Sequence, residues 1–275
     1  MKSTIEKGED GTITLTITIP ADLVKTTFDE VLDDIAKNAS ISGFRKGKAP
    51  KKLVKDKVDK EKAREEVLKK LLPQGYSQAL NEHNIRPIMN PKIHVESLEE
   101  DKDWKFTAKT CESPTVNLNG YKNNIQKITA KSKIVIPGKE QQPVNLDEII
   151  NELFKSVKVS VPQVVTEQEV ERMLAQTLDE IKRLGLTLDQ YLSSTHKTIE
   201  GMQAEFAQKA ESDIKLEFIL QKIAEEEKIT VDEKEIADTI TKAKDETQRK
   251  NLEGNRYLLA SIIRQQKTLD FLKNL

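Results

Sequence analysis

At 275 residues the chain is long enough for about two domains, because a single hydrophobic core usually stops growing near roughly 250 to 300 residues. Charged residues make up 33% of the chain and aromatic residues 4%, which is typical of long exposed helices rather than of one thick core. The net charge of −1 conceals a basic window, Arg45 to Lys62, with nine lysine or arginine residues against three acidic ones. This asymmetry points to an anionic partner for one part of the chain only.

A single cysteine, Cys111, excludes an intramolecular disulfide and favours a reducing, cytoplasmic setting. The first ten residues are charged and lack the apolar run of a signal peptide, and no segment approaches the roughly 18 apolar residues of a membrane span. We therefore expect a cytoplasmic protein without a membrane partner.

The first elements in chain order are two strands and a helix. Thr12 to Ile19 alternates threonine with isoleucine or leucine, the pattern of a half-buried strand, and Lys2 to Lys7 is expected to pair with it as a hairpin. A helix is predicted after Pro20, with Asp22 as its N-cap. Its inward face carries apolar residues at helical spacing: Phe28, Val31, Leu32 and Ile35.

A short basic stretch follows, with two glycines, a lone aromatic residue and a proline: Gly43-Phe44-Arg45-Lys46-Gly47-Lys48-Ala49-Pro50. Glycine on both sides of Phe44 lets the backbone turn sharply, which suits display of Phe44 to a partner. An ordinary basic turn with Phe44 folded back into the core is the alternative. The residues alone leave both interpretations open.

Helical patterns resume after this stretch, as a short helix over Lys51 to Lys57 and a stronger one from Glu61 to about Leu72. The second helix is expected to bury Ala63, Val67, Leu68, Leu71 and Leu72. Pro73 and Gly75 are expected to kink or split any continuation.

Two more strands, Lys92 to Glu96 and Trp104 to Thr110, complete an α+β domain over residues 1–112. Residues 113–146 are broken by prolines at 114, 137 and 143 and are predicted to form an extended linker, with one strand near Ile134 to Ile136.

The remaining chain, residues 147–275, is predicted to be an all-α domain with helical arms. Helices are expected over residues 145–158 (with Asn145 as a cap), 166–184, 187–193, 198–228, 232–252 and 257–275. Most of the apolar residues on these long charged helices must be core, but a minority left exposed would suit unfolded chains. The candidates are Met173, Leu174, Leu178, Ile181 and Leu184, and Leu216, Phe218, Ile219, Leu220 and Ile223.

Signals for catalysis or metal binding are poor. His83, His94 and His196 stand alone, without the spacing of a zinc site. Gly43 and Gly47 do not form a phosphate-binding loop, and no carboxylate pair is marked by an apolar pocket. We expect no catalytic residue, no metal and no cofactor.

The stretch from Gly43 to Pro50 resembles the ribosome-docking signature of bacterial trigger factors, G-F-R-x-G-x-x-P. The flanking elements occur in the order of that family's N-terminal domain, and Val159 to Pro162 and Ile229 to Val231 are similar to parts of its helical domain. The resemblance implies that Phe44, Arg45 and Lys46 contact a protein of the large ribosomal subunit and ribosomal RNA at the exit tunnel. The implied ribosome-binding set is Gly43, Phe44, Arg45, Lys46, Gly47, Lys48 and Pro50.

The resemblance also implies a chaperone whose helical domain holds unfolded nascent polypeptides, and it allows a homodimer away from the ribosome. Members of the family usually carry a prolyl-isomerase domain of the FKBP type between these parts. Here only about 30 residues with one aromatic, Tyr121, are left for it, too few for that fold or for an aromatic proline pocket. We therefore predict no isomerase activity.

Two other functions stay open. An RNA-binding or ribosome-assembly factor would use the basic stretch as a clamp, with salt-dependent binding to naked RNA and no effect on aggregating proteins. A prolyl isomerase with its pocket in the helical part would be revealed by catalysis on a proline peptide.

Overall fold

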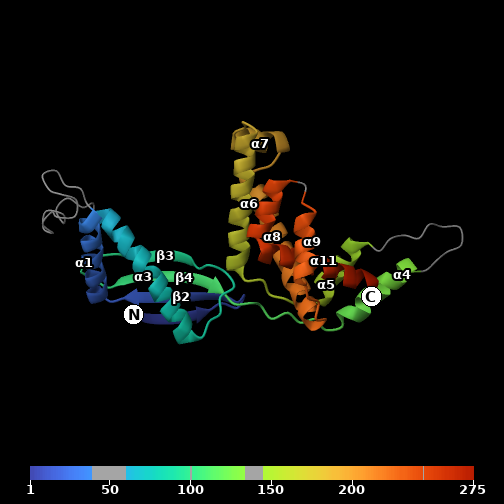
Figure 1. Ribbon diagram of the computed structural model, residues 1–275, viewed down its shortest axis with the longest axis horizontal. Coiled ribbons are helices and arrows are strands. Elements are labelled where there is room, and N and C mark those ends of the chain that lie inside the picture. Colours follow the sequence, from blue (N-terminus) through green and yellow to red (C-terminus); the bar gives the residue numbers. More distant parts are fainter. Residues whose placement is uncertain (39–59, 100, 134–144, 244) are drawn as a thin grey trace. The chain divides into compact units, whose positions relative to one another are not determined.

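The computed structural model describes residues 1–38, 60–99, 101–133, 145–243 and 245–275. They form two compact units, residues 1–113 with 162–165, and residues 114–161 with 166–275. The first unit contains an antiparallel sheet and the second is mostly helical (Figure 1). The predicted fold class, an α+β domain followed by a helical domain, is therefore confirmed.

The sheet contains β1 (Lys2–Lys7), β2 (Thr12–Ile19), β3 (Lys92–Ser97) and β4 (Trp104–Cys111) in the order β1-β2-β4-β3. Neighbouring strands are antiparallel, as the sequence predicts for the β1-β2 hairpin. The apolar residues of β2 are all buried: Ile13, Leu15, Ile17 and Ile19. Alternation along β2 therefore sends one full face of the strand into the core.

Two helices of this unit, α1 (Ala21–Asn38) and α3 (Lys60–His83), pack against that apolar face (Figure 1). Val31 and Leu32 of α1 and Val67 and Leu71 of α3 are buried in the same core as β2 and β4. The expected N-cap at Asp22 is wrong, because α1 already begins at Ala21 and Asp22 lies in its first turn. A carboxylate there still interacts favourably with the N-terminal end of the helix dipole.

The split expected at Pro73 and Gly75 is also wrong, because α3 is one continuous helix with Pro73 inside it. The residues on both sides of the proline are held by the core, since Leu71 and Ala79 are each 1% exposed. A methyl group added to Gly75 would lie 3.2 Å from Ile17 and 3.3 Å from Phe106. The glycine therefore allows the helix to approach the sheet, and this packing outweighs the local cost of the proline.

The second unit comprises a series of helices: α4 (Tyr121–Lys133), α5 (Leu146–Ser156), α6 (Gln163–Arg183), α7 (Leu188–Thr195), α8 (Ile199–Glu226), α9 (Glu233–Thr241), α10 (Glu246–Gly254) and α11 (Arg256–Asn274), except that residues 163–165 at the start of α6 belong to the first unit. The predicted cap of α5 is confirmed, because the Asn145 side chain accepts a 2.9 Å hydrogen bond from the Asp147 N–H. One helix expected over 232–252 is instead two, α9 and α10.

The extended linker expected over residues 113–146 is wrong for residues 121–133, which form helix α4. Tyr121 and Ile125 are buried in a cluster with Ile149 and Leu153 of α5 and Ile219 of α8. The hydroxyl of Tyr121 donates a 2.9 Å hydrogen bond to the Glu227 carboxylate. The segment thus belongs to the helical unit. Its helix is stabilised by tertiary packing, which its own sequence pattern does not predict.

Buried apolar residues form two clusters in the described part of the helical unit. The larger one joins α4, α5, α8 and α11, and the smaller one joins α9 and α11 through Ile236, Ile240 and Leu259. No helix among the described residues is long and apolar enough to cross a membrane.

Candidate functional site

The predicted docking residues Gly43 to Pro50 lie outside the described residues, as do the helix expected over Lys51 to Lys57 and the strand expected near Ile134 to Ile136. The structure describes the helices on either side, α1 and α3. Their contact includes an ion pair between Lys70 and Asp34 at 3.2 Å, and Lys37 also bonds to Asp34 at 3.1 Å. Hydrogen bonds from Lys37 and then Lys70 lower the pKa of the Asp34 carboxyl. In the sequence, the motif therefore falls between two helices that contact each other and the sheet.

In the helical unit, large apolar side chains are exposed where α6 ends. Leu184 is 69% exposed, and Leu186 and Ile199 are also exposed on either side of α7. Gly185 has a φ of 72°, a left-handed conformation that glycine adopts readily at a helix C-terminus. Helix α7 lies at the end of α6 (Figure 1), so these side chains belong to the tip of a helical projection.

This tip is nevertheless ordered by its own contacts. Thr187 and Gln190 form a capping box at the start of α7. Ile181 of α6, Leu192 of α7 and Met202 of α8 are buried. The exposed residues are therefore carried on a structured projection.

A second exposed apolar patch lies at the start of α11 and is formed by Tyr257, Leu258 and Ile262. Tyr257 is 96% exposed and Ile262 is 53% exposed, whereas Leu259 is buried against α9. Helical geometry is consistent with this difference, because Leu259 and the partly buried Ile263 lie one turn apart on the face that packs against the α9 cluster.

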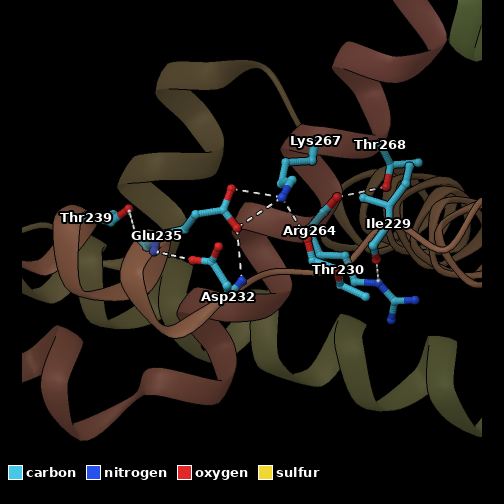
Figure 2. A network of polar contacts seen from close by, with 8 residues as sticks. All are labelled: Ile229, Thr230, Asp232, Glu235, Thr239, Arg264, Lys267 and Thr268. Carbon is cyan, nitrogen blue, oxygen red and sulfur yellow. Dashed lines mark hydrogen bonds and ion pairs between the residues drawn. The ribbon is translucent and has the colours of Figure 1, made fainter.

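The helix α9 that packs beside α11 begins with a second capping box (Figure 2). The Asp232 side chain accepts from the Glu235 N–H at 2.9 Å, and the Glu235 carboxylate accepts from the Asp232 N–H at 3.0 Å. The Thr239 hydroxyl donates to the Glu235 carbonyl oxygen at 2.8 Å. The start of α9 is therefore closely defined.

Two cations of α11 hold the link between α8 and α9, as Figure 2 shows. Lys267 donates to the Thr230 carbonyl at 2.7 Å and to the Glu235 carboxylate at 2.8 Å, while Arg264 Nε donates to the Ile229 carbonyl at 3.0 Å. The Lys267 bond, followed by the Asp232 backbone bond, lowers the pKa of the Glu235 carboxyl. These polar contacts join α9 to α11 where the apolar cluster is small.

A groove of about 540 Å³ lies between α8, residues 229–231 and α11. Leu220 and Ala224 of α8 supply apolar walls, and Arg264 and Gln265 of α11 supply polar groups. Tyr257 precedes the groove-lining Ser261 by one helical turn. An apolar patch next to a mixed groove suits weak contact with many different polypeptide segments.

The described residues contain no group of three or more histidine, cysteine or acidic side chains that could hold a metal. Within the described ranges there is one Ser-His-carboxylate cluster, in which Ser3 Oγ donates to Glu82 at 2.6 Å and lies 3.0 Å from His83 Nε2. In a catalytic triad the carboxylate orients the histidine, but here it binds the serine. The cluster joins β1 to α3 and has the geometry of a structural contact.

The sequence named some of the exposed apolar residues and missed others. Of its candidates, Leu178 and Leu184 are exposed, whereas Ile181, Ile219, Leu220 and Ile223 are buried. Tyr257, Leu258 and Ile262 were placed on a helix but not singled out. A signal existed, because the successive apolar residues 257–260 cover more of the helix than one neighbour can bury.

Together these features define a class: a protein with a small α+β domain and a helical domain that carries ordered, exposed apolar projections. The family models for the bacterial trigger factor protein and for its C-terminus match residues 1–140 and 138–274. The chain therefore belongs to the trigger factor family. The two matches meet, so they leave no stretch between them for an isomerase domain.

Curated relatives agree with this assignment. A trigger factor from Lactococcus lactis is 34% identical over 134 residues, which is 49% of this chain and 31% of the relative. One from Staphylococcus carnosus is 35% identical over 122 residues, 44% of this chain and 28% of the relative. The aligned part thus spans about a third of the curated relatives' own length.

Among solved structures, a trigger factor chaperone described in a study of promiscuous substrate recognition in folding and assembly has a TM-score of 0.64 to this chain. The match covers 100% of this chain and 99% of that chain at 13% identity, which establishes similarity of fold. None of the comparisons favours the alternative of an RNA-binding or assembly factor.

Proposed function

We propose that this protein is a ribosome-associated chaperone that docks near the nascent-chain exit and holds emerging unfolded polypeptides, without prolyl-isomerase activity. The observation that carries the proposal is the exposed apolar surface of the helical unit, at Leu184, Leu186 and Ile199 and at Tyr257 and Ile262. Side chains of this size on ordered helices offer an adaptable surface to unfolded chains.

The docking half of the proposal rests on the motif Gly43 to Pro50 and on membership of the family. Phe44, Arg45 and Lys46 would contact a protein of the large subunit and ribosomal RNA, and Gly43, Gly47 and Pro50 would shape the turn, with Lys48 adding charge. Cations beside one aromatic anchor suit a mixed surface of protein and phosphate.

The mechanism is passive and needs neither nucleotide nor metal. Each apolar contact with an unfolded segment is weak, but docking beside the exit raises the effective concentration of the chaperone around its client. Holding covers apolar surface that would otherwise aggregate while the chain is incomplete. Away from the ribosome the same surface could be covered in a homodimer, which belongs to the proposal as well.

The proposal is tested by ribosome co-sedimentation of the variant Phe44→Ala/Arg45→Ala/Lys46→Ala. We expect binding at least about tenfold weaker than that of the parent, because an interface anchor and two phosphate-facing charges are removed together. A matched control, Lys2→Ala/Ile93→Ala/Lys109→Ala, removes two charges and one apolar side chain at exposed positions of β1, β3 and β4, outside the basic window Arg45 to Lys62. It should bind within about twofold of the parent. Equal binding by the motif variant and the parent would contradict the docking model.

A further inference from the structure

A second groove in the helical unit is surrounded by lysines. It has a volume of about 550 Å³ and lies between the C-terminal end of α5, the residues that follow α5, and α8. Its lining includes Lys155, Lys158 and Lys215, and none of its lining residues is acidic. We call it the lysine groove.

None of these three lysines forms an ion pair within 4 Å with a carboxylate in the part of the chain that the structure describes. Lys215 Nζ is 3.5 Å from the Phe154 carbonyl oxygen and 5.3 Å from the centre of the Phe154 ring, both neutral partners. By contrast, Lys122 and Lys267 of the same unit each pair with a glutamate. The groove therefore keeps a net positive charge.

Helix capping accounts for only part of this arrangement. Lys155 lies in the last turn of α5, where a cation interacts favourably with the helix dipole. Lys158 follows the helix and Lys215 lies on α8, so neither is explained in this way. Both nevertheless line the same groove as Lys155.

The floor of the lysine groove is apolar and well anchored. Val157 is 1% exposed, and Phe154 and Val159 pack against the core cluster that contains Leu153 and Ile219. Because these residues are fixed by the core, the groove does not have to order its floor when a ligand binds. A ligand that fits it needs apolar groups as well as negative charge.

The backbone beside the groove is extended. The Asn117 N–H donates to the Lys158 carbonyl oxygen at 3.2 Å, and the two residues form an isolated antiparallel bridge. An extended wall with alternating side chains suits an extended peptide. A nucleic acid is a poorer fit, since the one aromatic ring in the lining, Phe154, already has the Lys215 ammonium over it.

We propose that the lysine groove binds acidic, partly apolar polypeptide segments in an extended conformation. The inference rests on the proposed function, because it specifies one class of segment within the clients that the helical unit holds. It adds to the exposed apolar patches a site that selects for charge. Neighbouring carboxylates of an acidic segment repel one another. Pairing them with the three lysine ammonium groups reduces this repulsion and favours binding of the segment.

The test uses the full chain and fluorescence anisotropy with two labelled peptides of roughly ten residues, one alternating glutamate and valine and the other alternating lysine and valine. We expect the parent to bind the acidic peptide at least about tenfold more tightly than the basic one. The variant Lys155→Gln/Lys158→Gln/Lys215→Gln should lose about tenfold or more in affinity for the acidic peptide. The same peptide should bind the parent more weakly as salt is raised.

A matched control, Lys182→Gln/Lys209→Gln/Lys234→Gln, removes the same charge from exposed lysines on α6, α8 and α9. It should stay within about twofold of the parent. Equal loss in both variants, no preference of the parent for the acidic peptide, or displacement of that peptide by a uridine oligonucleotide at lower concentration would overturn the proposal.

If the triple variant melts at a lower temperature, Lys155→Gln/Lys158→Gln replaces it, since both side chains are exposed. That double variant should still lose about fivefold in affinity for the acidic peptide. The groove variants should keep ribosome co-sedimentation and the holding of an uncharged apolar client. Loss of acidic-peptide selectivity is therefore distinguishable from failure of the proposed function.

Discussion

The two units treat apolar surface in different ways. In the first, β2 and β4 direct alternate residues into one core with α1 and α3, and Leu15, Ile17 and Ala108 are completely buried. In the second, the buried residues form separate clusters, and large apolar side chains are exposed at helix ends: Leu184, Leu186, Ile199, Tyr257, Leu258 and Ile262.

Architecture accounts for this difference. A strand pattern of period two gives a sheet one apolar face, and two helices can cover that face completely. A helix that projects beyond its neighbours is covered on one side at most, so an apolar stripe wider than the contact stays exposed. The first unit, which we call the closed unit, therefore gathers most of its apolar residues in one core, whereas the second leaves large apolar side chains exposed.

The largest expected effect is on the closed unit, through Phe106→Ala. Phe106 is 2% exposed at the centre of the sheet, so its loss should lower the free energy of unfolding of this unit by about 3 to 5 kcal/mol. Its melting temperature should fall by more than about 10 °C. Trp104, the single tryptophan of the chain, is buried in the same core, so its fluorescence reports this unit.

The control for this prediction is Ile219→Ala in the larger cluster of the helical unit, where Ile219 is fully buried. It should shift the transition seen by far-ultraviolet circular dichroism and leave the Trp104 transition in place, since the two units have separate cores. A single transition that moves equally in both variants would refute independent cores.

The closed unit was also the more predictable one from sequence. Unbroken alternation over Thr12 to Ile19 leaves one arrangement that buries all its isoleucines, and the hairpin before it follows. Local propensity alone predicts that a proline at position 73 splits the helix, but packing against the sheet keeps α3 continuous. Gly75 lies where α3 closely approaches the sheet, and this contact cannot be inferred from the sequence before the helix and the sheet are located in space.

The helical unit was less predictable, because its stability comes from distant partners. Helix α4 has a weak pattern of its own, yet Ile125 is completely buried beside residues far along the chain. Likewise, helical spacing predicts the same environment for Ile181 and Leu184. Ile181 is buried, whereas Leu184 is exposed because it lies where the projection ends. Which apolar residues form a binding surface depends on where neighbouring helices stop, and periodicity does not encode that.

A smaller effect is expected from the pH dependence of the α4 contact. The hydrogen bond from Lys122, together with that from Tyr121, lowers the pKa of the Glu227 carboxyl below its usual value. A depressed folded-state pKa stabilises the unit above the unfolded-state pKa, and this stabilisation is lost as pH falls through the folded-state value. The contribution should be below about 1 kcal/mol, since the pair is partly solvated.

Thermal melts of Glu227→Gln followed by circular dichroism check this prediction. At neutral pH the variant should be less stable than the parent, and the difference should shrink as pH is lowered to roughly 3. The control Glu253→Gln, an exposed residue of α10, should differ little from the parent at either pH. A difference between Glu227→Gln and the parent that stays constant with pH would show that packing rather than charge anchors α4.

The smallest effect on stability, and the one that bears most directly on function, is expected from the variant Leu184→Ser/Leu186→Ser/Tyr257→Ser/Ile262→Ser. These side chains are exposed, so each substitution should change the free energy of unfolding by no more than about 0.5 kcal/mol. Suppression of client aggregation, followed by light scattering after dilution of a denatured protein, should nevertheless weaken several-fold, because the holding surface is removed.

The matched variant Ile88→Ser/Ile93→Ser makes the same chemical change at the two large apolar residues that the first unit exposes among its described residues. If exposure alone were enough for client binding, this pair of substitutions would weaken the suppression of client aggregation in proportion to the number of residues replaced. We expect no measurable loss in the suppression of client aggregation. The two residues belong to the first unit, whereas in the proposed function an unfolded chain binds to the projections of the helical unit. An equal loss of aggregation suppression per substituted residue in both variants would contradict this difference between the units. It would mean that any exposed apolar side chain binds clients, wherever it lies in the fold.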